Sequence, residues 1–204
     1  MKFVELNKAQ NIVKYTGLIT RHDREILHGH RGCIVWFTGL PSSGKSTLAH
    51  AVESYLYHKG YKTFVLDGDN VRYGLCSDLG FSKEDRTENL RRIAEISKLL
   101  IEGGLVVLAA FVSPLKSDRD KVRTIVGAHD YIEVFCSCPI ETCEQRDPKQ
   151  HYQKARSVQI KEFTGISSPY EIPESPDLVV DTSIQTIASC VESVSKLLKN
   201  ETLA

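Results

Sequence analysis

Eight residues with the sequence GLPSSGKS, at positions 39–46, constrain this chain more than any other stretch. They fit the pattern G-x-x-x-x-G-K-[ST] of a phosphate-binding P-loop. An apolar, β-prone run at 33–38 precedes the loop, and a helical pattern from Thr47 to about His58 follows it. A strand, a glycine-rich loop and a helix are the context that this motif needs, so we expect the loop to bind a nucleoside triphosphate.

The glycines, the lysine and the serine of this loop each suit phosphate binding for a chemical reason. Gly39 and Gly44 let the backbone bend around an anion, and the loop amides with the helix N-terminus attract phosphate. Lys45 would reach the outer phosphates, and the Ser46 hydroxyl would be a ligand of Mg²⁺. The alternative is a glycine-rich turn with a stray lysine. The expected ATP-binding residues of this stretch are Gly39, Leu40, Pro41, Ser42, Ser43, Gly44, Lys45, Ser46 and Thr47.

Composition narrows the class of protein. The chain has 204 residues, of which 41% are hydrophobic, enough for one domain with its own core. Its 26 Lys and Arg balance 26 Asp and Glu, which argues against nucleic-acid binding through bulk positive charge. No run of about 20 apolar residues predicts a membrane span, and the N-terminus shows no apolar signal core. We therefore expect a cytoplasmic protein with neither a membrane nor a nucleic-acid partner.

The cysteines and the paired histidines do not form a metal motif. Six cysteines stand at positions 33, 76, 136, 138, 143 and 190, and none makes the C-x-x-C spacing of a zinc site. We expect reduced thiols that pack as small hydrophobic groups. His28 and His30 could hold a metal, but a solvated turn is the simpler interpretation. Residues 1–30 are polar and are expected to pack on the domain or on a partner subunit.

Strand and helix patterns alternate along the rest of the chain. Five apolar runs predict strands at 33–38, 62–66, 105–112, 131–136 and 178–180. Helical patterns lie between and after them, at 47–58, 82–102, 117–126, 140–145 and 183–198. Ser82 and Ser117 are the expected N-caps of two of these helices. The alternation predicts an α/β fold of three layers, with a parallel sheet and helices on both faces.

Two carboxylates follow the second predicted strand, in the sequence Asp67-Gly68-Asp69. The carboxyl ends of parallel strands face the ligand crevice, so both side chains would lie where the P-loop opens. A simple turn is the alternative. The most apolar strand ends at Ser113-Pro114 and carries no Walker-B aspartate, so Asp67 or Asp69 must supply the carboxylate near the metal. We expect Asp67 to hold Mg²⁺, directly or through a water molecule.

The helical pattern at 82–102 places polar residues on its inward face. Its apolar stripe consists of Leu90, Ile93, Ala94, Ser97, Leu100 and Ile101. Arg86 and Asn89 extend this stripe toward the start of the helix. A guanidinium there needs an anion, so Arg86 would bind a ligand or pair with Glu53 or another acid. Arg91 and Arg92 fall off the stripe and are expected on a solvated face.

A basic segment late in the chain predicts a lid. Residues 149–162 carry Lys149, Lys154, Arg156 and Lys161 on an expected helix. In a P-loop kinase such a segment is where a lid closes over phosphates, and an ordinary exposed helix is the alternative. We therefore expect a kinase domain at 31–200 with a lid at about 147–165. The proline-rich loop that follows would carry Phe163 to a fixed place.

Taken together, these motifs resemble the adenylyl-sulfate kinase (APS kinase) family from about residue 20 to 200. The segments that carry the resemblance are GLPSSGKS, LDGDNVR, LGFS, RTENLRR, FVSP, EQRDPK, QKAR, FTGI and SPYEIPESPDLVVDT. The family transfers the γ-phosphate of ATP to the 3′-hydroxyl of adenosine 5′-phosphosulfate. The resemblance implies a P-loop nucleoside triphosphate hydrolase-like fold, 3′-phosphoadenosine 5′-phosphosulfate and ADP as products, Mg²⁺ as cofactor, a homodimer, and a role in sulfate assimilation.

The resemblance also implies roles for single residues. The residues that would bind the sulfonucleotide are Asp69, Asn70, Arg72, Phe81, Arg86, Asn89, Val112, Ser113, Lys149 and Phe163. Phe81 and Phe163 would enclose the substrate adenine, and Arg146 would lie on the ATP adenine.

Lys45, Asp69 and Ser113 would be catalytic. Asp69 would accept or orient the 3′-hydroxyl proton. Ser113 matches a serine treated in the family as a phosphorylated intermediate, although in-line transfer needs only positioning and electrostatics.

Two segments depart from the family pattern. The usual loop resembles GLSGSGKS, whereas here Pro41 replaces a small residue and removes one N–H from the phosphate cradle. The usual lid reads DPKGLYKKAR, whereas here Gln150, His151 and Gln153 replace Gly, Leu and Lys.

Three other functions share part of the pattern. A different small-molecule kinase, such as a nucleoside or shikimate kinase, would have the loop without the combined DGDNVR, RTENLRR and FTGI segments. A GTPase-like switch would need an N-K-x-D guanine motif, which is absent. An inactive paralogue that binds another sulfur-activation enzyme would not need Lys45, Ser46, Asp69 and Arg86 together.

Overall fold

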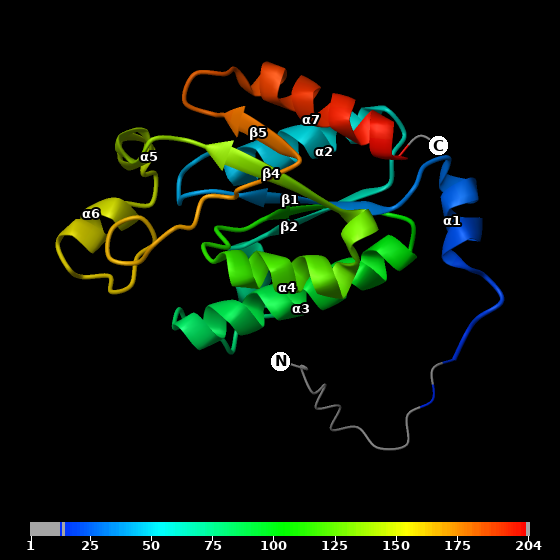
Figure 1. Ribbon diagram of the computed structural model, residues 1–204, viewed down its shortest axis with the longest axis horizontal. Coiled ribbons are helices and arrows are strands. Elements are labelled where there is room, and N and C mark those ends of the chain that lie inside the picture. Colours follow the sequence, from blue (N-terminus) through cyan, green and yellow to red (C-terminus); the bar gives the residue numbers. More distant parts are fainter. Residues whose placement is uncertain (1–12, 14, 203–204) are drawn as a thin grey trace.

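A five-stranded sheet forms the middle of three layers in the computed structural model, which describes residues 13 and 15–202 (Figure 1). All neighbouring strands are parallel, in the order β2-β3-β1-β4-β5. The strands are β1 (Cys33–Thr38), β2 (Thr63–Asp67), β3 (Val106–Ala110), β4 (Tyr131–Ser137) and β5 (Leu178–Asp181). The predicted α/β class and parallel sheet are confirmed.

Helices cover both faces of this sheet. One layer is formed by α2 (Lys45–His58) and α7 (Ile187–Thr202), and the other by α3 (Lys83–Glu102) and α4 (Lys116–Val126) (Figure 1). The short helices α5 (Ile140–Arg146) and α6 (His151–Arg156) project beyond the carboxyl ends of the strands, whereas α1 (Arg21–His28) lies at the opposite end. Two 3-10 turns, η1 (Asn70–Tyr73) and η2 (Ala128–Asp130), complete the described elements.

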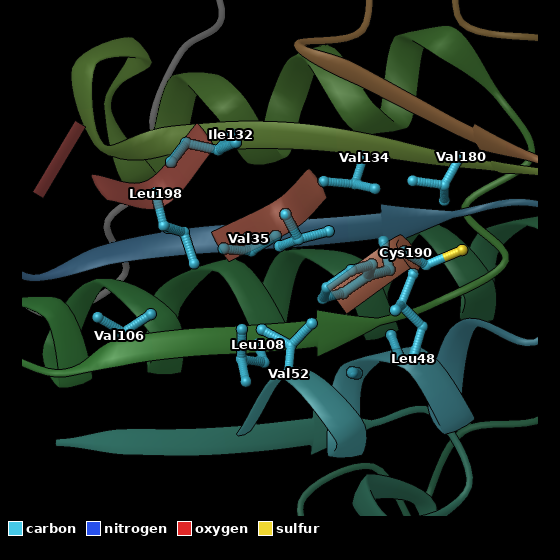
Figure 2. Close-up of a cluster of buried hydrophobic side chains, with 14 of the residues drawn as sticks. Val35, Leu48, Val52, Val106, Leu108, Ile132, Val134, Val180, Cys190 and Leu198 are labelled. Atoms are coloured by element: carbon cyan, nitrogen blue, oxygen red, sulfur yellow. The ribbon is translucent and has the colours of Figure 1, made fainter. Parts of the chain in front are cut away.

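The strand β1 is buried along its whole length, as the continuous apolar run at 33–38 predicts. Val35 and Phe37 face the layer of α2 and α7, and Ile34 and Trp36 face the layer of α3 and α4. Figure 2 shows Val35 among side chains such as Leu48 from α2 and Leu198 from α7. The P-loop therefore leaves a strand that cannot shift without disturbing both cores.

Helix starts follow local capping signals in some places and distant groups in others. The Ser82 hydroxyl accepts a hydrogen bond from the Asp85 amide at 3.1 Å, as predicted for the start of α3. Ser117 does not cap α4, because that helix begins one residue earlier. The amide of Lys116 instead donates to the Glu171 carboxylate at 2.5 Å. A residue 55 positions away thus satisfies the first turn of α4.

The last helix begins at Ile187 rather than at the predicted Ser183. The Thr186 hydroxyl accepts from the Ser189 amide at 3.2 Å, which is the spacing of an N-cap. Ser183 is held instead in a turn, since both its amide (2.9 Å) and its hydroxyl (2.5 Å) donate to the Asp181 carboxylate. Because Ser183 is bound to Asp181 at the end of β5, Thr186 and not Ser183 caps the last helix.

The helix α1 is attached to the core through Asp130. Arg21 donates to both oxygens of this carboxylate, at 2.6 and 2.8 Å, and Arg31 donates to one of them at 2.7 Å. Burial alone would raise the pKa of Asp130, but the hydrogen bonds from the two arginines outweigh it and the pKa is lowered. Most of the segment that precedes α1, residues 1–12 and 14, lies outside the described residues.

The turn after α1 is not solvated at His30, which is 6% exposed. Its ring stacks between those of His28 and Tyr61, at centroid distances of 5.7 and 4.8 Å. Its Nε2 accepts from the Lys62 amide at 2.9 Å, so Nδ1 carries the proton and donates to the Arg31 carbonyl at 3.2 Å. Burial lowers the pKa of His30, which suits a neutral ring with both nitrogens in use.

We predict that Asp130→Asn destabilises the protein by about 1.5–3 kcal/mol, because the two arginines lose their charged partner. Asp120→Asn is the matched control. It breaks an i,i+4 pair with Lys116 in which the aspartate side chain is 60% exposed, and such a pair contributes about 0.3–0.5 kcal/mol. Urea unfolding of both variants measures the difference. Equal losses in the two variants would contradict the role given to Asp130.

Candidate active site at the carboxyl ends of the strands

The phosphate-binding loop joins β1 to α2 with two glycines in conformations that other residues rarely adopt. Gly39 has φ 152° and Gly44 has φ 87°. A Cβ on Gly39 would come within 2.6 Å of the Cys136 carbonyl oxygen on the neighbouring strand β4. The loop thus packs tightly against β4 only because position 39 has no side chain.

Lys45 points back over the loop that precedes it. Its ammonium donates to the carbonyls of Gly39 (3.0 Å) and Leu40 (2.6 Å), and its side chain is nearly fully buried. Burial lowers the pKa of Lys45 to about 8. Ser46 and Thr47 follow on the first turn of α2 and are exposed, so the Ser46 hydroxyl is accessible to a metal ion.

Asp67 ends β2 and carries a buried oxygen without a protein partner. Its Oδ1 accepts from the Asp69 amide at 3.0 Å, whereas its Oδ2 has no hydrogen-bond partner within the described residues. An unpaired buried carboxylate oxygen requires a cation or a water molecule. Since Mg²⁺ prefers oxygen ligands and keeps several waters, Asp67 and Ser46 fit the predicted metal.

Arg72 and Phe81 contact each other between η1 and the start of α3. The Arg72 guanidinium lies 4.4 Å from the Phe81 ring centroid and donates to the Gly80 carbonyl at 2.8 Å. Phe81 is 67% exposed, so one face of its ring is open to a second planar group. Asn70, which begins η1, is exposed beside Asp69.

Arg86 contacts neutral oxygen atoms rather than a carboxylate. It donates to the Phe81 carbonyl (2.9 Å), the Thr164 hydroxyl (3.0 Å) and the Glu162 carbonyl (2.7 Å). The alternative partner, Glu53, lies near His50 at 3.6 Å. Partial burial lowers the pKa of Arg86. A guanidinium held only by neutral groups retains a positive charge that an anion can use.

Asn89 lies one turn further along α3, on the same inward face as predicted. It is 3% exposed, and its Nδ2 donor has no partner within the described part of the chain. A buried amide donor without an acceptor is costly, and a ligand oxygen or a water would satisfy it. Among the residues that the structure describes, Asn89 of α3 thus has an unpaired donor, and Asp67 at the end of β2 has an unpaired acceptor.

Arg92 lies off the apolar stripe on the surface, as expected, but its side chain is only 27% exposed because several surface groups hold it. It donates to Asp78 at 2.6 and 2.8 Å, to Glu88 at 2.9 Å and to the Leu75 carbonyl at 3.1 Å. Arg92 therefore fastens the loop after η1 to α3. Arg91 is 51% exposed and pairs only along its own helix, as the stripe indicates.

Ser113 lies in a buried chain of hydrogen bonds behind the strand ends. The Trp36 indole donates to Ser113 Oγ at 3.0 Å, and Ser113 donates to Thr38 Oγ1 at 2.9 Å. Thr38 donates to the Val112 carbonyl at 2.8 Å, so the Tyr170 hydroxyl, at 2.9 Å, must donate to Thr38. Ser113 is only 2% exposed, with φ 38°. Its proton is directed into the protein.

Residues of the predicted lid contact Asp69 and the P-loop. Lys149 forms an ion pair with Asp69, and the Tyr152 hydroxyl donates to the Pro41 carbonyl at 2.9 Å. Phe163 is 8% exposed and packs edge-on against Tyr152 at 5.0 Å. The two rings predicted to enclose the adenine thus differ: Phe81 is exposed, whereas Phe163 is buried against Tyr152. The expected helix at 149–162 is limited to α6.

Arg146 ends α5 near the carboxyl ends of β4 and β5. Its guanidinium donates to the Thr182 carbonyl at 2.6 Å and to Cys138 Sγ at 3.7 Å. The main-chain carbonyl fixes the plane of the guanidinium, which can stack on a purine.

The cysteines are buried except Cys138, which is half-buried. Within the described residues, no three His, Cys, Asp or Glu side chains form a group that could hold a metal ion. In the same part of the chain, no helix combines the length and apolar character that a membrane span requires.

Sequence reasoning missed several residues of this region. Tyr152, Tyr170 and Glu171 were given no role, although the last two lie in the segment SPYEIPESPDLVVDT. Each makes a hydrogen bond with a residue more than 50 positions away, which no local pattern indicates. Asp147 was noted only as part of a motif. Its carboxylate accepts from the amides of His151 (2.9 Å) and Tyr152 (2.7 Å) and so caps α6.

Comparison with known proteins identifies the family. A family model described as adenylylsulphate kinase matches residues 31–181. The chain belongs to the adenylylsulphate kinase family. An adenylyl-sulfate kinase of Thermodesulfovibrio yellowstonii is 52% identical over 94% of this chain and 96% of that protein. One of Shewanella amazonensis is 57% identical over 85% of this chain and 87% of its own length.

Solved structures of adenylylsulphate kinases agree with the fold. The Mycobacterium tuberculosis APS kinase CysC in complex with AMPPNP and APS has a TM-score of 0.80 and 48% identity, covering 83% of this chain and 98% of that chain. A hexameric APS kinase from Thiobacillus denitrificans has a TM-score of 0.63 and 31% identity, and this chain covers 30% of it. The predicted P-loop nucleoside triphosphate hydrolase-like fold is confirmed.

The lowered pKa of Lys45 predicts that triphosphate binding takes up a proton. At about pH 9 a lysine with a pKa of about 8 is mostly neutral, and an adjacent triphosphate favours its ammonium form. At about pH 6.5 the ammonium is already present, so uptake at this site disappears. Calorimetric titration with magnesium and ATP in buffers of different ionisation enthalpy measures the proton count at each pH.

Lys149→Met should retain this uptake, because Lys149 is an exposed lysine outside the loop. Lys45→Met should lose it. The same proton count at both pH values in the unmodified protein would show that Lys45 is not the group that titrates.

Proposed function

We propose that this chain is an adenylyl-sulfate kinase that transfers the γ-phosphate of ATP to the 3′-hydroxyl of adenosine 5′-phosphosulfate. The products are 3′-phosphoadenosine 5′-phosphosulfate and ADP, in sulfate assimilation. The observation that carries the proposal is structural. The P-loop, the unpaired Asp67 oxygen and the unpaired Asn89 donor occur in a chain of this family, one member of which has been solved with AMPPNP and APS.

Residues 39–47 hold the phosphates of ATP, and Arg146 lies on its adenine. Lys45 leaves the carbonyls of Gly39 and Leu40 for the phosphate oxygens, whose charge restores its full pKa. Ser46 and Asp67 hold Mg²⁺, directly or through water. When bound there, the ion would supply positive charge that offsets the charge developing on the transferred phosphoryl group.

The sulfonucleotide binds opposite the loop. Arg72 and Arg86 bind the phosphosulfate anion, and Asn89 donates to one of its oxygens. The substrate adenine lies between Phe81 and Phe163. Asn70, Val112 and Lys149 complete the pocket.

Asp69 accepts or orients the proton of the 3′-hydroxyl. Its Oδ2 faces Lys149, which leaves Oδ1 for the hydroxyl group. This arrangement lets in-line transfer proceed by positioning and electrostatics alone. Ser113 supports the strand end, because its oxygen already accepts from Trp36 and its proton is donated to Thr38.

The assembly and location remain part of the proposal. We expect a homodimer in the cytoplasm, with residues 1–30 packing on the core or on the partner subunit and residues 147–165 acting as the lid. The hexameric relative indicates that other assemblies occur in the family. Light scattering of the purified chain measures which one forms.

The direct test is incubation with ATP, Mg²⁺ and adenosine 5′-phosphosulfate, with adenosine monophosphate as the control acceptor. We expect ADP and the 3′-phosphorylated product only with the sulfonucleotide. Lys45→Ala should lower turnover by about 100- to 1000-fold while circular dichroism shows an intact fold. Lys98→Ala, which removes an exposed lysine of α3, is the control. Equal phosphorylation of adenosine monophosphate would point to a nucleotide kinase instead.

Arg86→Ala should weaken adenosine 5′-phosphosulfate strongly and ATP hardly at all. Losing a charge-assisted contact costs about 1.5–3 kcal/mol, which is roughly 10- to 150-fold in affinity. Arg91→Ala is the matched control on the same helix, since Arg91 is 51% exposed and pairs with Glu88 and Glu95. Calorimetric titration of both ligands measures the effect. A similar loss for ATP would contradict the assignment of Arg86 to the second substrate.

A further inference from the structure

One short segment of the lid contacts both halves of the active site. Arg146, at its start, lies on the side of the proposed ATP adenine and is fixed by the Thr182 carbonyl at 2.6 Å. Lys149, three residues on, forms an ion pair with Asp69 on the side of the second substrate. Tyr152, a further three residues on, reaches the P-loop itself. The two ligand sites are therefore connected within seven residues of chain.

Tyr152 contacts the P-loop through a partly buried hydrogen bond. Tyr152 is 2% exposed, and its hydroxyl donates to the Pro41 carbonyl at 2.9 Å. Pro41 has no N–H, so this carbonyl is its sole backbone hydrogen-bonding group. Burial raises the pKa of Tyr152 far above its usual range, so the hydroxyl keeps its proton and remains a donor.

The backbone amide of Tyr152 is held by Asp147, the residue that follows Arg146. The Asp147 carboxylate, adjacent to Arg146, accepts from the amides of His151 at 2.9 Å and Tyr152 at 2.7 Å. Gln150 lies between them with φ 55°, in the left-handed region that glycine favours. The start of α6 is therefore fixed against α5 and does not swing as a free helix.

Apolar contacts join the same two segments. Leu40 of the P-loop packs with Tyr152 and Phe163 in a small core that belongs to the lid. A Cβ on Gly165 would come within 3.0 Å of Leu40 Cδ2, so the base of the lid lies directly on the loop. A change in the P-loop backbone at positions 40 and 41 is therefore transmitted to the ring of Phe163 through Tyr152.

We propose that Tyr152 is a positioning residue through which the phosphate-loaded P-loop fixes the lid over the second substrate. The inference rests on the proposed function. Phosphates order the loop and thereby the Pro41 carbonyl, so the lid is ordered before the sulfonucleotide arrives and that ligand loses less binding energy to ordering. The coupling is reciprocal, so the sulfonucleotide strengthens nucleotide binding by the same factor.

The test is the removal of one oxygen atom by Tyr152→Phe, which keeps the ring packed. Adenosine 5′-phosphosulfate is titrated with and without saturating AMPPNP and Mg²⁺. We expect AMPPNP to tighten sulfonucleotide binding in the unmodified protein. In Tyr152→Phe this enhancement should shrink by roughly 2- to 12-fold, which corresponds to a net hydrogen bond of about 0.5–1.5 kcal/mol. Each ligand alone should bind within about twofold of the unmodified protein.

Tyr57→Phe is the control, because Tyr57 is 70% exposed on α2, outside the lid. It should leave the enhancement unchanged. Three results would overturn the inference: independent binding of the two ligands in the unmodified protein, full enhancement in Tyr152→Phe, or an equal loss for each ligand alone accompanied by a lower unfolding temperature. If the unmodified protein binds neither ligand, the proposed function fails, and the inference fails with it.

Discussion

The burial of β1 on both faces is the constraint on which the rest of the structure depends. An all-apolar strand between β3 and β4 cannot shift, so the loop that leaves it has a fixed origin. Because Gly39 lies against the Cys136 carbonyl, the first residue of the loop is tied to a second strand as well. The buried ammonium of Lys45 and the open hydroxyl of Ser46 are consequences of this rigid base. Under the proposed function, the rearrangement on phosphate binding is confined to the loop beyond this base, where Lys45 would leave the carbonyls of Gly39 and Leu40.

Residues 147–165, the proposed lid, are held in a different way from β1. They have a small apolar core that includes Leu40 of the P-loop, and they contact the rest of the protein through side-chain hydrogen bonds and the ion pair of Lys149 with Asp69. Arg86 donates to the Glu162 carbonyl and the Thr164 hydroxyl, so under the proposed function the second substrate would compete with these two oxygens for the same guanidinium. A phosphate site on a rigid strand beside the proposed lid would suit a reaction that must exclude water and then release its product.

The sequence was sufficient wherever one stretch of chain determined its own structure. The five strands follow from apolar runs, and Ser82 caps α3 as its spacing predicts. Prediction failed where a distant group decided the outcome, as when Glu171 rather than Ser117 satisfied the start of α4. For the same reason the helix pattern does not indicate the contact of Arg92 with Asp78, which lies in a loop outside that helix. The P-loop and the carboxylates were identified from motifs, whereas Tyr152 and Tyr170 become visible only when the lid and the sheet are folded together.

The chain of hydroxyls behind the strand ends limits how this protein can change its sequence. Thr38 Oγ1 receives two donors, from Ser113 and Tyr170, and has one proton to give to Val112. Valine at position 38 would have nearly the same shape but would remove the acceptor of the Ser113 and Tyr170 hydroxyls, leaving Ser113 only its longer contact with the Phe111 carbonyl at 3.4 Å. Alanine at 113 would in turn leave the Trp36 indole unpaired. A single substitution in this network therefore costs stability by leaving a donor unpaired, whereas a joint replacement of the bonded residues need not. This restriction on sequence change comes from folding stability and not from contact with substrate.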